Sequence, residues 1–182
     1  IKRLVVATNV NDILVRALSR GDYSASGVTP TITPSMDIQV SSNFERLLFD
    51  CGGRDGAAMA AQMAGFAETR AMQLTNAQRE GAAGLFVGLS ADQDATARAM
   101  QWAHQEAGQI IDPHTAVGLS AARLAVNSDE IDPVVPVVTL ATAHPAKFRE
   151  AVERATGVRP SLPARVGDLF AREESFTELP GD

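Results

Sequence analysis

A run of β-branched and apolar residues followed by an abrupt turn constrains the fold more than any other feature of this chain. Residues 135–140 read Val-Pro-Val-Val-Thr-Leu, and the chain turns at His144-Pro145. A short apolar run of this kind predicts a strand that is buried on both faces. After the turn, apolar residues recur at helical spacing over about residues 146–156. A buried strand, a polar turn and a helix in succession form the local unit of an α/β fold.

The same unit is predicted at two other places. Residues 4–7 form an apolar run, a helical pattern follows to about Ser19, and Gly21 ends that helix. Residues 85–89 form another apolar run, with a helical pattern that follows to about residue 107. Because strands and helices alternate, we expect a mostly parallel sheet flanked by helices. The segments between these units predict further helices after Asn43, over about 55–72, after Asn76 and over about 113–126.

Candidate ligand-binding residues follow two of the predicted strands. Ligands of open α/β sheets lie beyond the carboxyl ends of the strands. Thr142, Ala143 and His144 occupy that position after one strand, and Asn9 occupies it after another. Each polar side chain has a simpler interpretation, because Asn9, Thr142 or His144 can merely cap the turn or helix that follows. From the residues alone, the favoured interpretation is that Asn9 or Asn11 caps the helix that follows, and that Thr142 caps the turn after it.

Two predicted helix starts offer further candidates. Ser42 and Asn43 precede a helical pattern, where they are expected to cap the helix, although free amides at such a terminus also bind phosphate. Asp112 and Pro113 predict another helix start, which places His114 in the first turn. A histidine in that place is commonly a plain polar residue. The loop over residues 21–37 is long enough to be a lid or a simple connection.

Composition excludes several classes of function. The net charge is −6 and no basic patch recurs along the chain, which argues against a nucleic-acid partner. No apolar run reaches the length that crosses a membrane. Cys51 is the only cysteine, so we expect no internal disulfide, a reducing compartment and a cytoplasmic location. The three histidines lack the spacing of metal ligands, so we expect no metal site.

Five stretches together resemble one enzyme family over essentially the whole chain. They read VVATNVNDIL (5–14), TPSMDIQVSSNFERLLFD (33–50), IIDPHTAVG (110–118), LATAHPAKF (140–148) and LPARVGDLFAREE (162–174). In this order they resemble threonine synthase, a lyase of fold type II that uses pyridoxal 5'-phosphate (PLP). The family's cofactor lysine and Gly-rich phosphate loop lie upstream of the segment that resembles Ile1. Residues 1–182 therefore resemble the C-terminal part of the PLP-binding catalytic region, and residues 159–182 are expected to form a surface-wrapping tail.

The resemblance implies a cofactor, a reaction and site residues. It implies that Thr142 presents a hydroxyl to the pyridine nitrogen of PLP, and it makes Asn9, Ser42, Asn43, His114 and His144 candidates for contact with the substrate. The implied reaction converts O-phospho-L-homoserine and water to L-threonine and phosphate. The only lysines are Lys2 and Lys147, and neither matches the family's reactive lysine. We therefore assign no catalytic residue to this chain and expect the isolated 182 residues to be inactive.

An alternative interpretation is not enzymatic. The residue pattern alone also fits an α/β domain that binds a phosphorylated metabolite or a protein partner. The sequence preceding Ile1 in the gene would discriminate between the two, because a Gly-rich phosphate loop and a distant lysine there would favour the enzyme.

Overall fold

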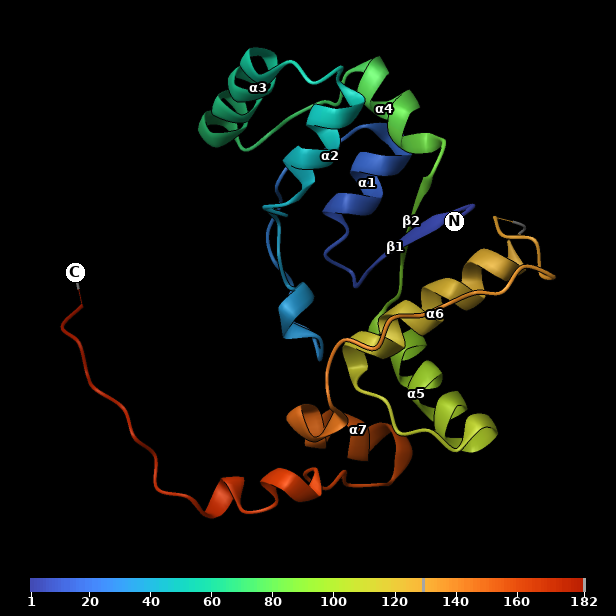
Figure 1. The fold of residues 1–182 in the computed structure, drawn as a ribbon, viewed down its shortest axis with the longest axis vertical. Helices are drawn as coiled ribbons and strands as arrows, with labels where there is room; N and C mark the ends of the chain where they lie inside the picture. The colour runs from blue at the N-terminus through green and yellow to red at the C-terminus, as the bar shows by residue number, and fades with distance from the viewer. Residues whose placement is uncertain (129, 182) are drawn as a thin grey trace.

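The computed structural model describes residues 1–128 and 130–181, and Figure 1 shows their arrangement. Helices surround a small parallel sheet, which confirms the predicted α/β class. In chain order the elements are β1 (Leu4–Thr8), α1 (Ile13–Arg20), a 3-10 helix (Pro34–Met36), α2 (Phe44–Cys51), α3 (Gly56–Thr69), α4 (Asn76–Ala83), β2 (Phe86–Ser90), α5 (Gln93–Ala107), α6 (Pro113–Asn127), a 3-10 helix (Pro145–Phe148), α7 (Arg149–Thr156) and two 3-10 turns (Ala164–Val166 and Leu169–Ala171).

The sheet joins two segments that lie far apart in the sequence. β1 pairs with β2 in parallel, with Leu4 opposite Phe86 and Thr8 opposite Ser90. α1 packs against both strands, and so does α6. Figure 1 shows these two helices on different sides of the strands. Because the strands are parallel and Thr8 lies opposite Ser90, both strands have their carboxyl ends at the same edge of the sheet. This is the edge at which ligands of α/β sheets bind.

Two groups of helices bury separate apolar clusters. One cluster lies among α1, α2 and α3, where the Tyr23 ring packs 5.1 Å from that of Phe44 and 5.0 Å from that of Phe66, between centroids. The other lies among α5, α6 and α7 and contains Met100 and Val152. Figure 1 shows the two groups at opposite ends, with the strands between them. The cofactor site expected at the strand ends thus lies beside the second group.

Helix starts follow capping chemistry in most places. Asp92 caps α5, and Asp112 caps α6 with Pro113 at the first helical position. Thr75 and Gln78 form a reciprocal capping box at α4. The prediction that Asn9 or Asn11 caps α1 is wrong, because the cap position is Asp12 and makes no side-chain capping bond. Asn43 does occupy the cap position of α2, but its side chain makes no capping bond either.

The predicted strand over residues 135–140 is wrong. The segment is extended but lies in no strand, and the described sheet contains only β1 and β2. It is not buried on both faces, since Val138 is 81% exposed and Leu140 is 76% exposed. An apolar run becomes a strand only when a neighbouring strand accepts its backbone hydrogen bonds. Instead of pairing with a strand, the segment runs alongside α6, as Figure 1 shows.

The predicted helix after His144-Pro145 is confirmed with one modification, because a 3-10 turn over Pro145–Phe148 precedes α7. Beyond α7 the chain is largely exposed, including Phe176 and Leu179. Wrapping of the surface by residues 159–182 stays a prediction. Among the described residues, no helix combines the length and the apolar character needed to span a membrane.

Candidate functional site

Thr142 lies against the first turn of α6 and its side chain is not sealed in the interior. The residue is exposed, and the small side chains of Ala141 and Ala143 flank it. The Thr142 amide donates a hydrogen bond of 3.0 Å to the Thr115 hydroxyl oxygen, and the two hydroxyl oxygens lie 3.4 Å apart. An added Cβ on Gly118 would lie 3.2 Å from the Thr139 methyl group. These contacts, at Thr115 with Thr142 and Gly118 with Thr139, show that the segment runs antiparallel to α6.

Asp112 connects Thr142 to the start of α6. It is 0% exposed, and one of its oxygens accepts from the His114 amide at 2.9 Å. The other oxygen accepts from the Thr115 amide at 3.3 Å and from the Thr115 hydroxyl. Since several donors surround this buried carboxyl group, its orientation is well determined. Asp112, Thr115 and Thr142 therefore form a continuous hydrogen-bonded row that leads from the interior to the exposed hydroxyl.

His114 joins the same row to the loop that follows β1. Its Nδ1 lies 3.1 Å from Asp112, and its Nε2 accepts from the Ser35 amide at 3.3 Å. Its ring packs 4.5 Å from that of Phe148, between centroids. With only 5% of its surface exposed, His114 is held on several sides. The histidine is therefore part of the packed frame behind Thr142, and direct contact with a ligand stays a prediction.

Asn9 anchors the loop that carries Ser35. It is 3% exposed, and its side-chain amide lies 2.9 Å from the Thr33 hydroxyl and 2.7 Å from Asp37 Oδ1. The side-chain oxygen of Asn9, Oδ1, accepts a hydrogen bond from the Asn11 backbone amide at 2.9 Å. Asp37 also accepts from the Thr31 amide at 2.8 Å. Asn9 at the end of β1 and Thr142 beside α6 thus belong to one polar system, in which the loop backbone from Thr33 to Ser35 joins the two hydrogen-bonded groups. A direct contact of Asn9 with substrate stays a prediction.

The remaining sequence candidates are placed differently. The His144 Nδ1 accepts from the Ala146 amide at 3.2 Å, which confirms the capping interpretation of that residue. Ser42 and Asn43 are exposed at the start of α2. Within residues 1–128 and 130–181, neither of these two side chains forms a hydrogen bond to Thr142, His114 or Asn9. The structure therefore connects Asn9, His114 and Thr142 and leaves the Ser42-Asn43 pair outside this system.

Sequence reasoning missed the residues that connect the site. It treated Asp112 as a cap alone and did not consider Thr115 or Asp37. The signal was present for Thr115, because a threonine three residues after an aspartate cap is placed to bond to that carboxylate. No local pattern indicates Asp37, since its partners Asn9 and Asn11 lie more than 20 residues earlier in the chain.

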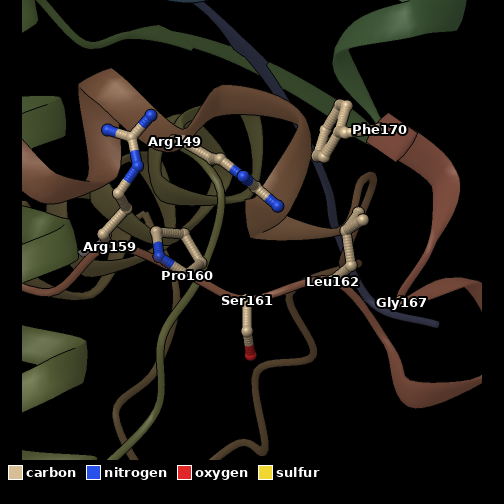
Figure 2. Close-up of a pocket in the computed structure, with 7 residues that line it drawn as sticks. All are labelled: Arg149, Arg159, Pro160, Ser161, Leu162, Gly167 and Phe170. Atoms are coloured by element: carbon tan, nitrogen blue, oxygen red, sulfur yellow. The ribbon is translucent and has the colours of Figure 1, made fainter.

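A cavity of about 530 Å³ lies away from this system, between α7 and the C-terminal tail (Figure 2). The Arg149 guanidinium points into it and stacks 4.3 Å from the Phe170 ring. Arg159, on the same wall, is already paired with Glu150 and Glu153. The Ser161 hydroxyl points away from the guanidinium groups in Figure 2. This cavity shares no residue with the row that ends at Thr142, so cavity size alone does not locate the site.

Cys51 and Lys147 are the other potentially reactive groups, and neither forms a second candidate site in the described part of the chain. Burial raises the pKa of the Cys51 thiol, and the neighbouring charge of Asp50 adds to this, so the thiol is a weak nucleophile. Lys147 is exposed, and its Nζ lies 5.8 Å from the centroid of the Phe148 ring. No group of three or more potential metal ligands occurs in the described part of the chain.

Known proteins are similar to this chain over its whole length. A family described as "Threonine synthase, C-terminal" matches residues 115–182. Threonine synthase of Pseudomonas aeruginosa is 44% identical over 183 residues, which cover 100% of this chain and 38% of that protein. Threonine synthase of Corynebacterium glutamicum is 35% identical over 191 residues, again with 100% of this chain and 38% of the relative covered.

Solved structures agree with the sequence matches. The crystal structure of PLP-bound threonine synthase from Brucella melitensis matches with a TM-score of 0.90 and 44% identity, over 98% of this chain and 38% of that chain. Yeast threonine synthase matches with a TM-score of 0.87 and 31% identity, over 95% of this chain and 38% of that chain. The present chain thus spans well under half the length of the proteins it matches. Over the length that it does span, the chain belongs to the threonine synthase family.

Proposed function

We propose that this chain is part of a threonine synthase, which converts O-phospho-L-homoserine and water to L-threonine and phosphate. We further propose that Thr142 meets the ring nitrogen of the PLP cofactor. The observation that carries the proposal is the exposed Thr142, whose backbone amide donates a hydrogen bond to the Thr115 hydroxyl oxygen at the start of α6. It lies in the part of the chain that the family match covers. The relative from Brucella melitensis, which matches over nearly the whole chain, is a PLP-bound enzyme.

The residues around Thr142 fit a flat heteroaromatic ring. Ala141 and Ala143 leave space on both sides of the hydroxyl, and the residue itself is open to solvent. The backbone of Thr142 is fixed by the bond from its amide to Thr115, so the hydroxyl is presented from a determined position. A neutral hydroxyl donates a hydrogen bond to a pyridine nitrogen without transferring its proton. Such a bond contributes about 1 kcal/mol, which orients the ring more than it retains it.

PLP, when bound, supplies an electron sink for the carbanions that this reaction passes through. The residues of this chain have the task of orienting the ring and the substrate. We propose that His114 and Asn9 act through the packed frame that supports this edge, because both are nearly buried. His144 shapes the turn that follows Thr142 by accepting from the Ala146 amide.

We also propose that the start of α2 contacts the phosphate of the substrate. The Asn43 side chain makes no capping bond there, and Ser42 is exposed beside it. The amides of the first helical turn are donors of the kind that bind phosphate. Because these residues lie outside the polar system of Thr142, the substrate would have to extend between the two regions.

The lysine that binds the cofactor covalently is proposed to come from outside these 182 residues. Lys147 is exposed in the 3-10 turn after His144 and lies beside the Phe148 ring. Lys2 precedes β1, at the amino end of the sheet. We therefore propose that the isolated chain makes no threonine and binds PLP weakly.

Complementation tests the proposed function. The complete gene, expressed in a threonine auxotroph, is expected to restore growth without added threonine. The purified gene product is expected to release phosphate from O-phospho-L-homoserine and to show the near-visible absorbance of bound PLP. A product that binds no PLP and releases no phosphate would refute the enzyme and leave the non-enzymatic binding domain. Near-visible absorbance of PLP bound to the isolated 182 residues would contradict the proposed dependence on an outside lysine.

A further inference from the structure

We infer that Thr115 is a positioning residue for the reaction, because it holds the backbone of Thr142 and so fixes the place from which the Thr142 hydroxyl meets the ring nitrogen of PLP. This inference rests on the proposed function and goes beyond it, since neither the family match nor the fold assigns a role to Thr115. It concerns the row of hydrogen bonds that runs from Asp112 through Thr115 to Thr142.

Each hydroxyl group of the row can donate a single proton. A threonine hydroxyl has one proton and two acceptor sites. The Thr115 proton is directed to Asp112 Oδ2. The Thr115 oxygen therefore acts as an acceptor toward Thr142, and it takes the Thr142 amide proton at 3.0 Å. Thr115 has no proton left to give to Thr142.

The hydrogen bonds of Thr115 limit the hydrogen bonds that the Thr142 hydroxyl can form. The Thr142 hydroxyl oxygen lies 3.4 Å from the Thr115 oxygen, at the far end of hydrogen-bonding range. Because Thr115 donates to Asp112, Thr142 has to supply the proton of this contact. The contact is long and weak, so little is lost when the Thr142 hydroxyl turns to a better acceptor. An unprotonated pyridine nitrogen is such an acceptor, and a protonated one is not.

Asp112 is what keeps the row in this direction. It is 0% exposed and is surrounded by the amides of His114 and Thr115 as well as the Thr115 hydroxyl. Without this neighbour the Thr115 hydroxyl would be free to rotate, and its oxygen would hold the Thr142 amide less firmly. The row therefore keeps the Thr115 oxygen turned toward Thr142 and fixes the position of the exposed residue, while the weak contact between the two hydroxyls leaves the Thr142 proton available to the ring nitrogen.

The test uses the complete gene product loaded with PLP that carries ¹⁵N at the ring nitrogen. Thr115→Val removes the hydroxyl and keeps the shape, and Thr115→Ser keeps the hydroxyl. Thr96→Val is the matched control, because Thr96 is also buried near a helix start and, within the described residues, its hydroxyl bonds to the Asp92 carbonyl oxygen alone. The measurements are the ¹⁵N chemical shift of the ring and the dissociation constant of PLP. Circular dichroism checks that each variant is folded.

We expect Thr115→Val to weaken PLP binding roughly fivefold, as the loss of a modest hydrogen bond does, and to move the ¹⁵N resonance. Thr115→Ser should restore both values, and Thr96→Val should leave the resonance in place. If Thr115→Val does not fold, Thr115→Ala removes the same hydroxyl with a residue that favours helix. A folded variant without the hydroxyl that keeps the original resonance would overturn the inference. PLP binding and threonine formation by the unchanged protein, in that case, would leave the proposed function intact.

Discussion

At the scale of single residues, Asp112 combines two tasks that are usually separate. It caps α6 through the amides of His114 and Thr115, and it also accepts from the Thr115 hydroxyl. Asp92 performs only the first task, since its side chain accepts from the Ala95 amide at the exposed start of α5. The two aspartates thus allow the capping contribution to be separated from the contribution of the buried network.

Asp112→Ala is expected to lower the free energy of unfolding by about 2 kcal/mol or more, because it removes a cap and leaves buried donors without a partner. Asp92→Ala should lower it by about 1 kcal/mol, which is the usual effect of losing a cap alone. Urea denaturation of the two variants provides the comparison. Equal losses would mean that the network around Thr115 adds nothing to stability.

Residues that act through local chemistry were predictable from the sequence. Asp112-Pro113 gave the start of α6 and Gly21 gave the end of α1, because caps depend on neighbours within a few positions. Asn9 was misinterpreted, since its partners Thr33 and Asp37 come from a loop that only the fold brings near. The proposed role of Thr142 came from resemblance to a family, and Thr115 behind it was not found.

At the scale of elements, α1 lies unusually close to β2. A Cβ added to Gly88 would lie 2.8 Å from the Val15 Cα, which is backbone and cannot move aside as a side chain would. Glycine at this position therefore lets the helix backbone approach the strand. Gly84, just before β2, has open space around the same position, so it supplies a control in the same region.

Gly88→Ala is expected to lower the free energy of unfolding by about 1–3 kcal/mol, because the added methyl group has to push α1 away from the sheet. Gly84→Ala should change it by no more than about 0.5 kcal/mol. Thermal unfolding followed by circular dichroism measures both. A Gly88→Ala variant as stable as the unchanged chain would show that the contact between α1 and β2 is loose.

Helices, which form their hydrogen bonds locally, were predicted well, whereas only two of the three expected strands are present in the described sheet. β1 and β2 were both expected, and each supplies the other's hydrogen-bonding partner. The segment 135–140 has the same apolar character, yet no described strand pairs with it. Composition records that a segment is suited to a sheet, whereas pairing depends on what lies beside it.

At the scale of the whole molecule, several strongly exposed apolar side chains lie close together in the sequence. Val134, Val138 and Leu140 are each more than three-quarters exposed, and they lie on one extended segment. An unpaired extended segment with apolar side chains promotes association between chains.

The isolated 182 residues are therefore expected to associate as their concentration rises, and Val138→Lys should weaken that association. Val158→Lys serves as the control, because Val158 is also exposed but lies outside the segment. Light scattering over a dilution series gives the measurement. Association that persists unchanged in Val138→Lys, or that Val158→Lys reduces equally, would show that another surface is responsible.

The bond between Ser35 and His114 has a consequence for the histidine ring. Nε2 accepts a hydrogen bond from the Ser35 amide, so that nitrogen carries a lone pair and no proton. The single ring proton of the neutral imidazole therefore sits on Nδ1, facing Asp112. The loop after β1 and the beginning of α6 are thus fastened to each other by one tautomer of one ring.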